Sequence, residues 1–70
     1  MTPEQLINEA KKHLANVRTT SGRVSEADFP KVSFLDTAMI YFDSDERTDQ
    51  IRIVLERGSG RLVTITYSPN

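Results

Sequence analysis

Two apolar runs flank the segment Gly58-Ser59-Gly60, and they constrain the fold more than any other feature of the chain. Ile51, Ile53 and Leu55 recur at every second position before the glycines, and Val63, Ile65 and Tyr67 recur in the same way after them. A period of two is typical of a strand with one buried face. A three-residue loop, 58–60, brings all six apolar side chains to the same face, because a slip of one residue would turn one set outward. The segment therefore predicts an antiparallel hairpin in which Gly60 adopts a left-handed conformation.

A phosphate-binding loop is the alternative interpretation of these glycines, since Arg57 and Arg61 flank them. Such a loop needs its glycines between a strand and the N-terminus of a helix, where backbone N–H groups point at the anion. Here a second strand pattern follows, and the Gly-Lys-Ser/Thr ending of a phosphate loop does not occur. We therefore interpret the segment as a turn.

The same face extends backwards along the chain. Ala38, Ile40 and Phe42 share one parity, and a six-residue loop from Ser44 to Asp49 would set Phe42 beside Ile51 and Ile40 beside Ile53. The first strand is expected to begin near Lys31 and to bend at Asp36. The sequence thus predicts a three-stranded antiparallel meander whose central strand is 50–57.

The chain opens with strong helix signals over residues 3–18. Thr2 and Gln5 form a Thr-x-x-Gln capping box around Pro3, which suits the first helical position. An apolar stripe follows at helical spacing: Leu6, Ala10, Leu14 and Val17. Gly22 is a candidate stop signal. Between this helix and the sheet, the segment 25–28 predicts a short capped turn ended by Pro30, with Phe29 closing one end of the core.

Together these patterns predict a single α+β domain, 1–70, in which the N-terminal helix packs on one face of the three-stranded meander. The 70 residues include no cysteine, which excludes disulfides and thiolate metal sites. Nine basic and ten acidic residues give a net charge of −1, a balance untypical of general nucleic-acid or membrane-surface binders. The opening residues resemble no signal peptide, so we expect a cytoplasmic protein that makes no membrane contact.

Candidates for catalysis or metal binding are few. His13 is the sole histidine and lies late in the predicted helix, where a half-exposed structural role is the simpler interpretation. The segment 43–49 holds four carboxylates, but it lacks the glycine and glutamate that a calcium loop requires at its sixth and twelfth places. We interpret it as a solvated acidic loop. The sequence therefore predicts no enzyme, no metal and no cofactor.

The second face of the predicted sheet is the most informative feature for function. One helix cannot cover both faces, so this face stays open to a partner or to the segment 19–35. Aromatic, arginine and aliphatic side chains side by side are typical of protein interfaces, although an ordinary amphipathic sheet surface would look similar. We predict a protein-binding module of the inhibitor, immunity-protein or adaptor type. The predicted site comprises Met39, Tyr41, Arg52, Val54 and Leu62 on the open face, with Asp45 and Glu46 in the acidic loop.

Three alternatives remain open at the level of the sequence. A homodimer could form through the same face or by edge pairing of the last strand. Nucleic acid could bind to Arg52, Arg57 and Arg61 on the sheet. A small enzyme would need a pocket that holds His13 or the loop carboxylates.

The beginning of the chain, 2–12, and its end, 60–65, resemble those of PepSY and NTF2-like immunity domains. Those families open with a capped helix and close with a strand whose turn contains glycine. Any small protein with a helix and a hairpin shares these features, so the resemblance transfers no functional residue.

Overall fold

Helix α1, Pro3–Leu14, opens the fold in the computed structural model, which describes residues 1–19, 22–36, 38–44, 46 and 48–69. The predicted capping box is confirmed: the Gln5 N–H donates to Thr2 Oγ1 at 3.2 Å, and the Thr2 N–H donates to Gln5 Oε1 at 2.9 Å. Leu6, Ala10 and Leu14 form its buried stripe. These residues fix both the start of the helix and the side that it turns to the sheet.

The helix ends at Leu14, four positions before the predicted end at Arg18. Beyond Leu14 the chain turns so that Val17 is buried, and the Val24 N–H donates to the Val17 carbonyl at 3.2 Å. Strand β1, Arg18–Thr19, then pairs with β2, Gly22–Arg23. Gly22 has a φ of 113° and belongs to this small hairpin, so its predicted role as the helix stop was wrong.

The segment between β2 and the main sheet follows the prediction. Ser25 caps the 3-10 turn η1, Glu26–Asp28, by accepting a hydrogen bond from the Ala27 N–H at 3.3 Å. Phe29 follows the turn with no exposed surface, and Pro30 ends the segment. This turn therefore places Phe29 in the core.

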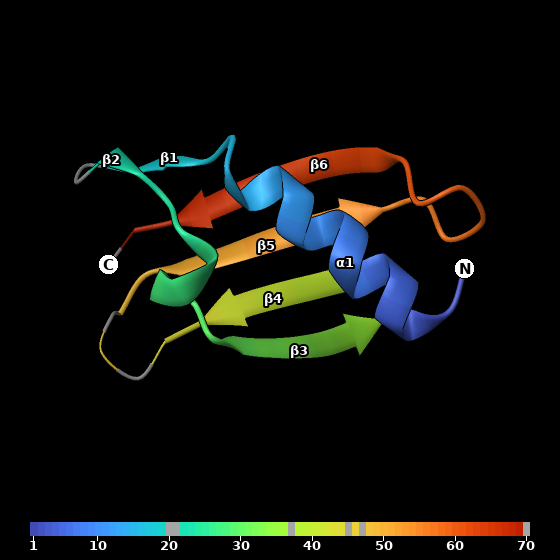
Figure 1. Ribbon diagram of the computed structural model, residues 1–70, viewed down its shortest axis with the longest axis horizontal. Coiled ribbons are helices and arrows are strands. Elements are labelled where there is room, and N and C mark those ends of the chain that lie inside the picture. The colour runs from blue at the N-terminus through green and yellow to red at the C-terminus, as the bar shows by residue number, and fades with distance from the viewer. Residues whose placement is uncertain (20–21, 37, 45, 47, 70) are drawn as a thin grey trace.

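The main sheet is an antiparallel meander in the order β3-β4-β5-β6 (Figure 1). Its strands are β3, Lys31–Asp36, β4, Met39–Asp43, β5, Gln50–Leu55, and β6, Leu62–Ser68. The predicted pairs Phe42–Ile51 and Ile40–Ile53 are confirmed, and β4 ends at Asp43 and β5 begins at Gln50, as the prediction requires. The α+β class is therefore confirmed, but the predicted three strands were one too few.

The fourth strand arises because the chain reverses between Asp36 and Met39, where we expected only a bend. Val32 lies opposite Phe42, and Phe34 lies opposite Ile40. Even-numbered residues share one face along a continuous strand. They also share one face across a hairpin when even-numbered residues pair with even-numbered ones, as they do here. The apolar pattern therefore fits both arrangements. Only the turn chemistry could separate them, and Asp36 is the one turn-favouring residue of this segment, which has no glycine, proline or asparagine.

The hairpin of β5 and β6 has a longer loop than predicted. Ile51–Tyr67 and Ile53–Ile65 pair as expected, but Leu55 lies opposite Leu62 and not opposite Val63. The loop comprises residues 57–60, since the Glu56 N–H donates to the Arg61 carbonyl at 2.7 Å. The additional residue is absorbed by a bulge at Val63, which leaves this side chain 60% exposed.

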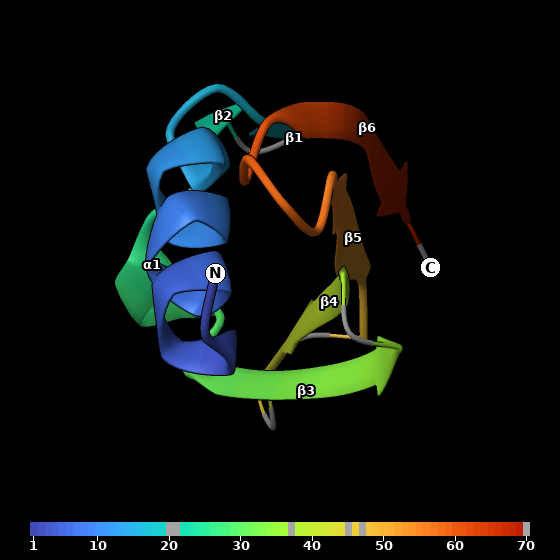
Figure 2. The ribbon, with the colours of Figure 1, turned by 90° about the vertical axis from the view of Figure 1, so that its right-hand side faces the viewer.

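A single core lies between α1 and the inner face of the sheet, which curves around the helix (Figure 2). β4 and β5 supply its centre with Ile40, Phe42, Ile51, Ile53 and Leu55, all at most 2% exposed. Because α1 covers only this side, the fold leaves the outer face of the sheet to solvent.

Candidate binding surface

The outer face is built from the side chains that alternate with the core residues of β4 and β5. One row across the four strands contains Ser33, Tyr41, Arg52 and Thr66, and the next contains Met39, Val54 and Thr64. Tyr41, Arg52, Met39 and Val54 are half-buried. No helix or strand of the described segments lies over these two rows (Figure 2). Four of the predicted site residues therefore lie next to one another, and we call these two rows the outer face.

Polar contacts on the outer face are few and long. Tyr41 Oη donates to Met39 Sδ at 3.5 Å, and Arg52 Nη2 donates to Thr66 Oγ1 at 3.4 Å. Arg52 Nε is buried and has no hydrogen-bond acceptor. The face thus combines aliphatic, aromatic and hydroxyl groups with one cation at its centre.

Leu62 does not belong to this surface, although we predicted it there. The bulge at Val63 shifts the register, so that Leu62 lies opposite Leu55 and packs against the core. A one-residue shift exchanges the faces of a strand, which explains the error. The sequence has no direct signal for the bulge. Gly60, with a φ of 73°, marks only the end of the four-residue loop.

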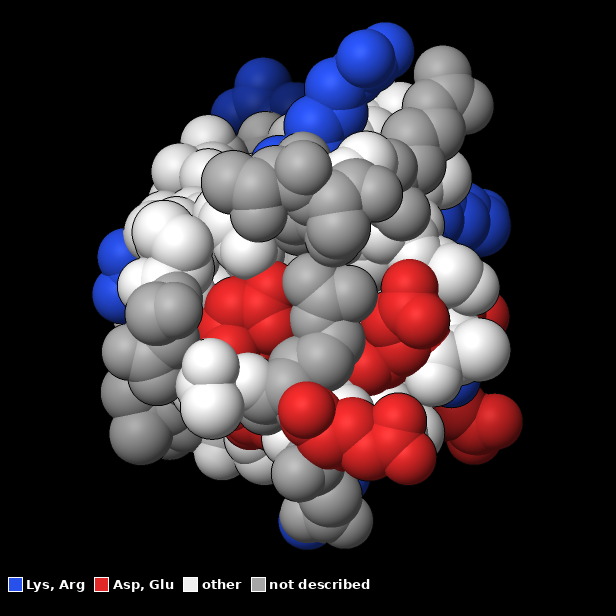
Figure 3. Space-filling view, turned by 90° about the vertical axis from the view of Figure 1, so that its left-hand side faces the viewer, with Lys and Arg blue, Asp and Glu red and all other residues white. Residues whose placement is uncertain are grey.

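The acidic loop lies at one end of the molecule. Acidic side chains gather where this loop and η1 meet that end (Figure 3). Most of the loop and η1 carboxylates have internal partners: Asp28 accepts the Ser25 N–H, Asp43 accepts Gln50 Nε2, Asp49 accepts the Tyr67 hydroxyl, and Glu26 pairs with Lys11. Glu46 is exposed, and Asp45 lies outside the described residues. Within the described segments, no three potential ligands converge on a metal site.

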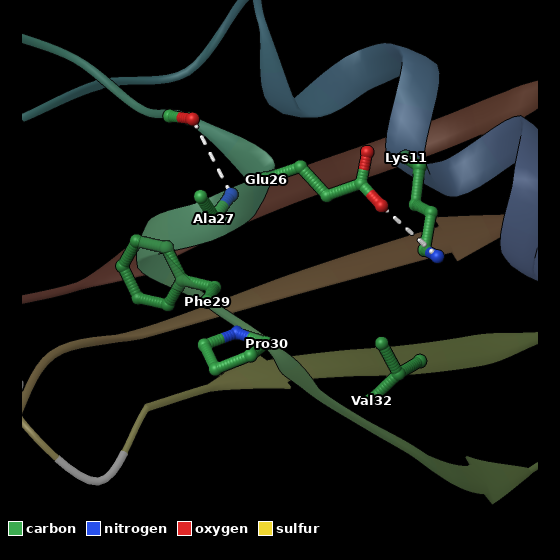
Figure 4. A pocket seen from close by; sticks show the side chains of 7 residues that line it. Lys11, Glu26, Ala27, Phe29, Pro30 and Val32 are labelled. Carbon is green, nitrogen blue, oxygen red and sulfur yellow. Dashed lines mark hydrogen bonds and ion pairs between the residues drawn. The ribbon is translucent and has the colours of Figure 1, made fainter.

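A shallow hollow, which the sequence did not predict, lies between α1, η1 and β3 (Figure 4). Phe29, Pro30 and Val32 supply its apolar lining, and the ion pair between Lys11 Nζ and Glu26 Oε1, at 3.1 Å, stands at its rim. These two charges neutralise each other. His13 does not line this hollow. The hollow therefore offers apolar contact but no group prepared for chemistry.

The Gly-Ser-Gly turn binds a carboxylate of the chain itself. Glu56 Oε1 accepts the N–H groups of Gly58, at 2.6 Å, and Ser59, at 3.0 Å, and Glu56 Oε2 accepts the Ser59 hydroxyl at 3.0 Å. The hydrogen bonds from Ser59 and Gly58, with the charge of Arg61, lower the pKa of Glu56 below its ordinary value of 4.5. The N–H groups that a phosphate would need are thus already occupied.

The three arginines of the nucleic-acid alternative do not converge. Arg52 lies at the centre of the outer face, whereas Arg57 and Arg61 are exposed at the β5–β6 turn. Five residues of strand span roughly 16 Å. Within the two rows of the outer face, Arg52 is thus the one described cation, and Lys31 lies opposite Asp43 in the row beyond them.

Comparisons with known proteins give no relative for this chain: no family model, no curated protein and no solved structure matches it. The described helices are also too short or too polar to cross a lipid bilayer.

Proposed function

We propose that the protein is a non-catalytic protein-binding module that docks a partner on the outer face of its sheet. The observation that carries this proposal is the open pair of rows around Tyr41 and Arg52, with Met39 and Val54 beside them. Aromatic, methionine and arginine side chains are enriched in protein interfaces, and central residues of this type dominate binding energy. An inhibitor, an immunity protein or an adaptor could each act in this way, by occupying a partner's surface.

The positions of two features indicate where the docking surface ends along the strands. The row containing Met39 and Val54 lies toward the β5–β6 turn, and the acidic loop with Glu46 lies beyond the opposite end of the face. A polar, charged rim is usual around the centre of an interface. We propose that the acidic loop attracts a basic region of the partner, which raises the association rate more than the affinity. The cysteine-free sequence suits a reducing compartment such as the cytosol.

Substitution of Met39 and Tyr41 by lysine tests this proposal. We expect the double variant to lose capture of a partner from the native host, because two charges would be buried at the centre of the interface. Its circular dichroism should match that of the unsubstituted protein, since both side chains lie outside the core. The measurement is affinity capture followed by titration of the purified partner.

The matched control carries Asn8→Lys and Asn16→Lys, which add the same two charges to exposed positions in α1 and just after it. We expect this control to bind the partner as the unsubstituted protein does. Equal binding by the Met39 and Tyr41 variant would show that the partner docks elsewhere.

A further inference from the structure

Arg52 lies at the centre of the outer face without a counter-charge. None of the side chains that the structure describes forms a salt bridge with its guanidinium group. In the adjacent row, the Asp43 carboxylate accepts a hydrogen bond from Gln50 Nε2 at 2.9 Å. Among the described residues, the central cation of the face therefore forms no ion pair.

The hydrogen bonding of Arg52 is also incomplete. Its single described hydrogen bond, from Nη2 to Thr66 Oγ1, is long at 3.4 Å, and its buried Nε has no acceptor. Withdrawing a charged donor from water without a partner is unfavourable. An aliphatic side chain with a similar stem would avoid this cost, so Arg52 is not the residue that stability alone would favour at this position.

We infer that the partner presents a carboxylate to Arg52, an inference that rests on the proposed docking function. A guanidinium group binds a carboxylate through paired hydrogen bonds, and the pair is strong when water is excluded. The hydroxyl groups of Tyr41 and Thr66 lie in the same row and can donate to the same anion. Met39 and Val54 supply the apolar surround that excludes water. The matching partner surface is an acidic side chain within an apolar patch.

A carboxylate fits this surface better than a nucleic-acid phosphate. The outer face offers one arginine, whereas phosphate backbones are bound by several cations in a row. The acidic end of the molecule would also repel a long polyanion (Figure 3). A single acidic side chain needs only the one cation, Arg52, that these two rows provide.

The first test is the thermal stability of Arg52→Met in the isolated domain. We expect its melting temperature to rise by about 4 °C or more, because the buried Nε–H that has no acceptor is removed and the aliphatic stem is kept. The control Arg18→Met removes an equal charge from an exposed site and should leave the melting temperature within about 1 °C. A lower melting temperature for Arg52→Met would overturn the inference, since Arg52 would then be a stabilising residue of the sheet.

The second test is a titration with sodium acetate, compared with sodium chloride at equal ionic strength and followed by NMR. We expect acetate to cause saturable shifts of the Arg52 Nε–H signal and of the Tyr41 and Thr66 amides, which Arg52→Met abolishes. Shifts no larger than those in chloride would overturn the carboxylate inference. Stronger, Arg52-dependent shifts with a thymidine oligonucleotide at low salt would overturn it in favour of nucleic acid.

The two proposals fail separately. If the partner is lost with the Met39 and Tyr41 variant but is still bound by Arg52→Met, the docking face stands and the carboxylate inference fails. If acetate binds at Arg52 while the Met39 and Tyr41 variant keeps its partner, the proposed docking function fails and an anion site remains.

Discussion

Gly60 shows how a backbone angle can fix the residue at one position. Its φ of 73° lies in the left-handed region, where a side chain is unfavourable. A Cβ atom at this position would also overlap the Met1 side chain. Gly60 therefore lies where the end of the β5–β6 loop packs against Met1, just ahead of α1.

Substitution of Gly60 by alanine should destabilise the protein by about 1–2 kcal/mol, the usual cost of a left-handed alanine, with any cost of moving Met1 in addition. This corresponds to a melting temperature lower by roughly 4–16 °C for a domain of this size. Gly58→Ala is the comparison, because Gly58 has no positive φ; its Cβ would lie 2.9 Å from Glu56 Oε1, so this variant disturbs the Glu56 hydrogen bonds without straining the backbone, and we expect it to lose less stability. Equal losses in the two variants would refute the conformational argument.

At the scale of elements, the β5–β6 hairpin is held by its own turn as well as by its pairs of side chains. The Glu56 carboxylate binds two backbone N–H groups and one hydroxyl group of the loop. These bonds need the ionised carboxylate, and they lower its pKa. The contribution of Glu56 to stability is therefore present above the ordinary pKa of 4.5 and is lost as the pH falls through the lower pKa of the folded state.

Substitution of Glu56 by glutamine should remove this part of the pH dependence. Between about pH 6 and about pH 3, the melting temperature of the unsubstituted protein should fall further than that of Glu56→Gln. The two proteins should therefore become more alike in acid. Glu46→Gln, which changes an exposed loop glutamate, serves as the control and should follow the unsubstituted protein. Parallel pH curves for Glu56→Gln and the unsubstituted protein would contradict the assignment.

The elements also show what the sequence could and could not predict. Local signals with a distinct chemistry succeeded, such as the Thr2 cap, the Ser25 turn and the left-handed Gly60. Apolar parity placed Ile40, Ile53 and Ile65 correctly, but parity cannot distinguish a bend from a hairpin, and so β3 was predicted as the first part of β4 and not as a separate strand. It also cannot reveal a bulge, and so Leu62 was assigned to the wrong face. Arg52 was placed correctly, but only the structure shows that no described side chain forms an ion pair with it.

The whole molecule has two layers, and its two sheet faces differ in role. α1, η1 and the first hairpin close the inner face around one core, whereas the outer face has no covering element among the described segments (Figures 1 and 2). The stability of the fold consequently depends mainly on the side chains of the inner face. The side chains of the outer face can therefore serve binding. A domain of 70 residues has little room for a second core, so a binding surface on the sheet is an economical arrangement.

Chemical-shift mapping with the purified partner tests this division of the faces most directly. The methyl groups of Met39 and Val54 and the amides of Tyr41 and Arg52 should shift on binding, because they lie on the outer face. The exposed positions of α1, such as Asn8 and Lys12, should stay unchanged. Shifts confined to α1, with Met39 and Val54 unaffected, would contradict the account.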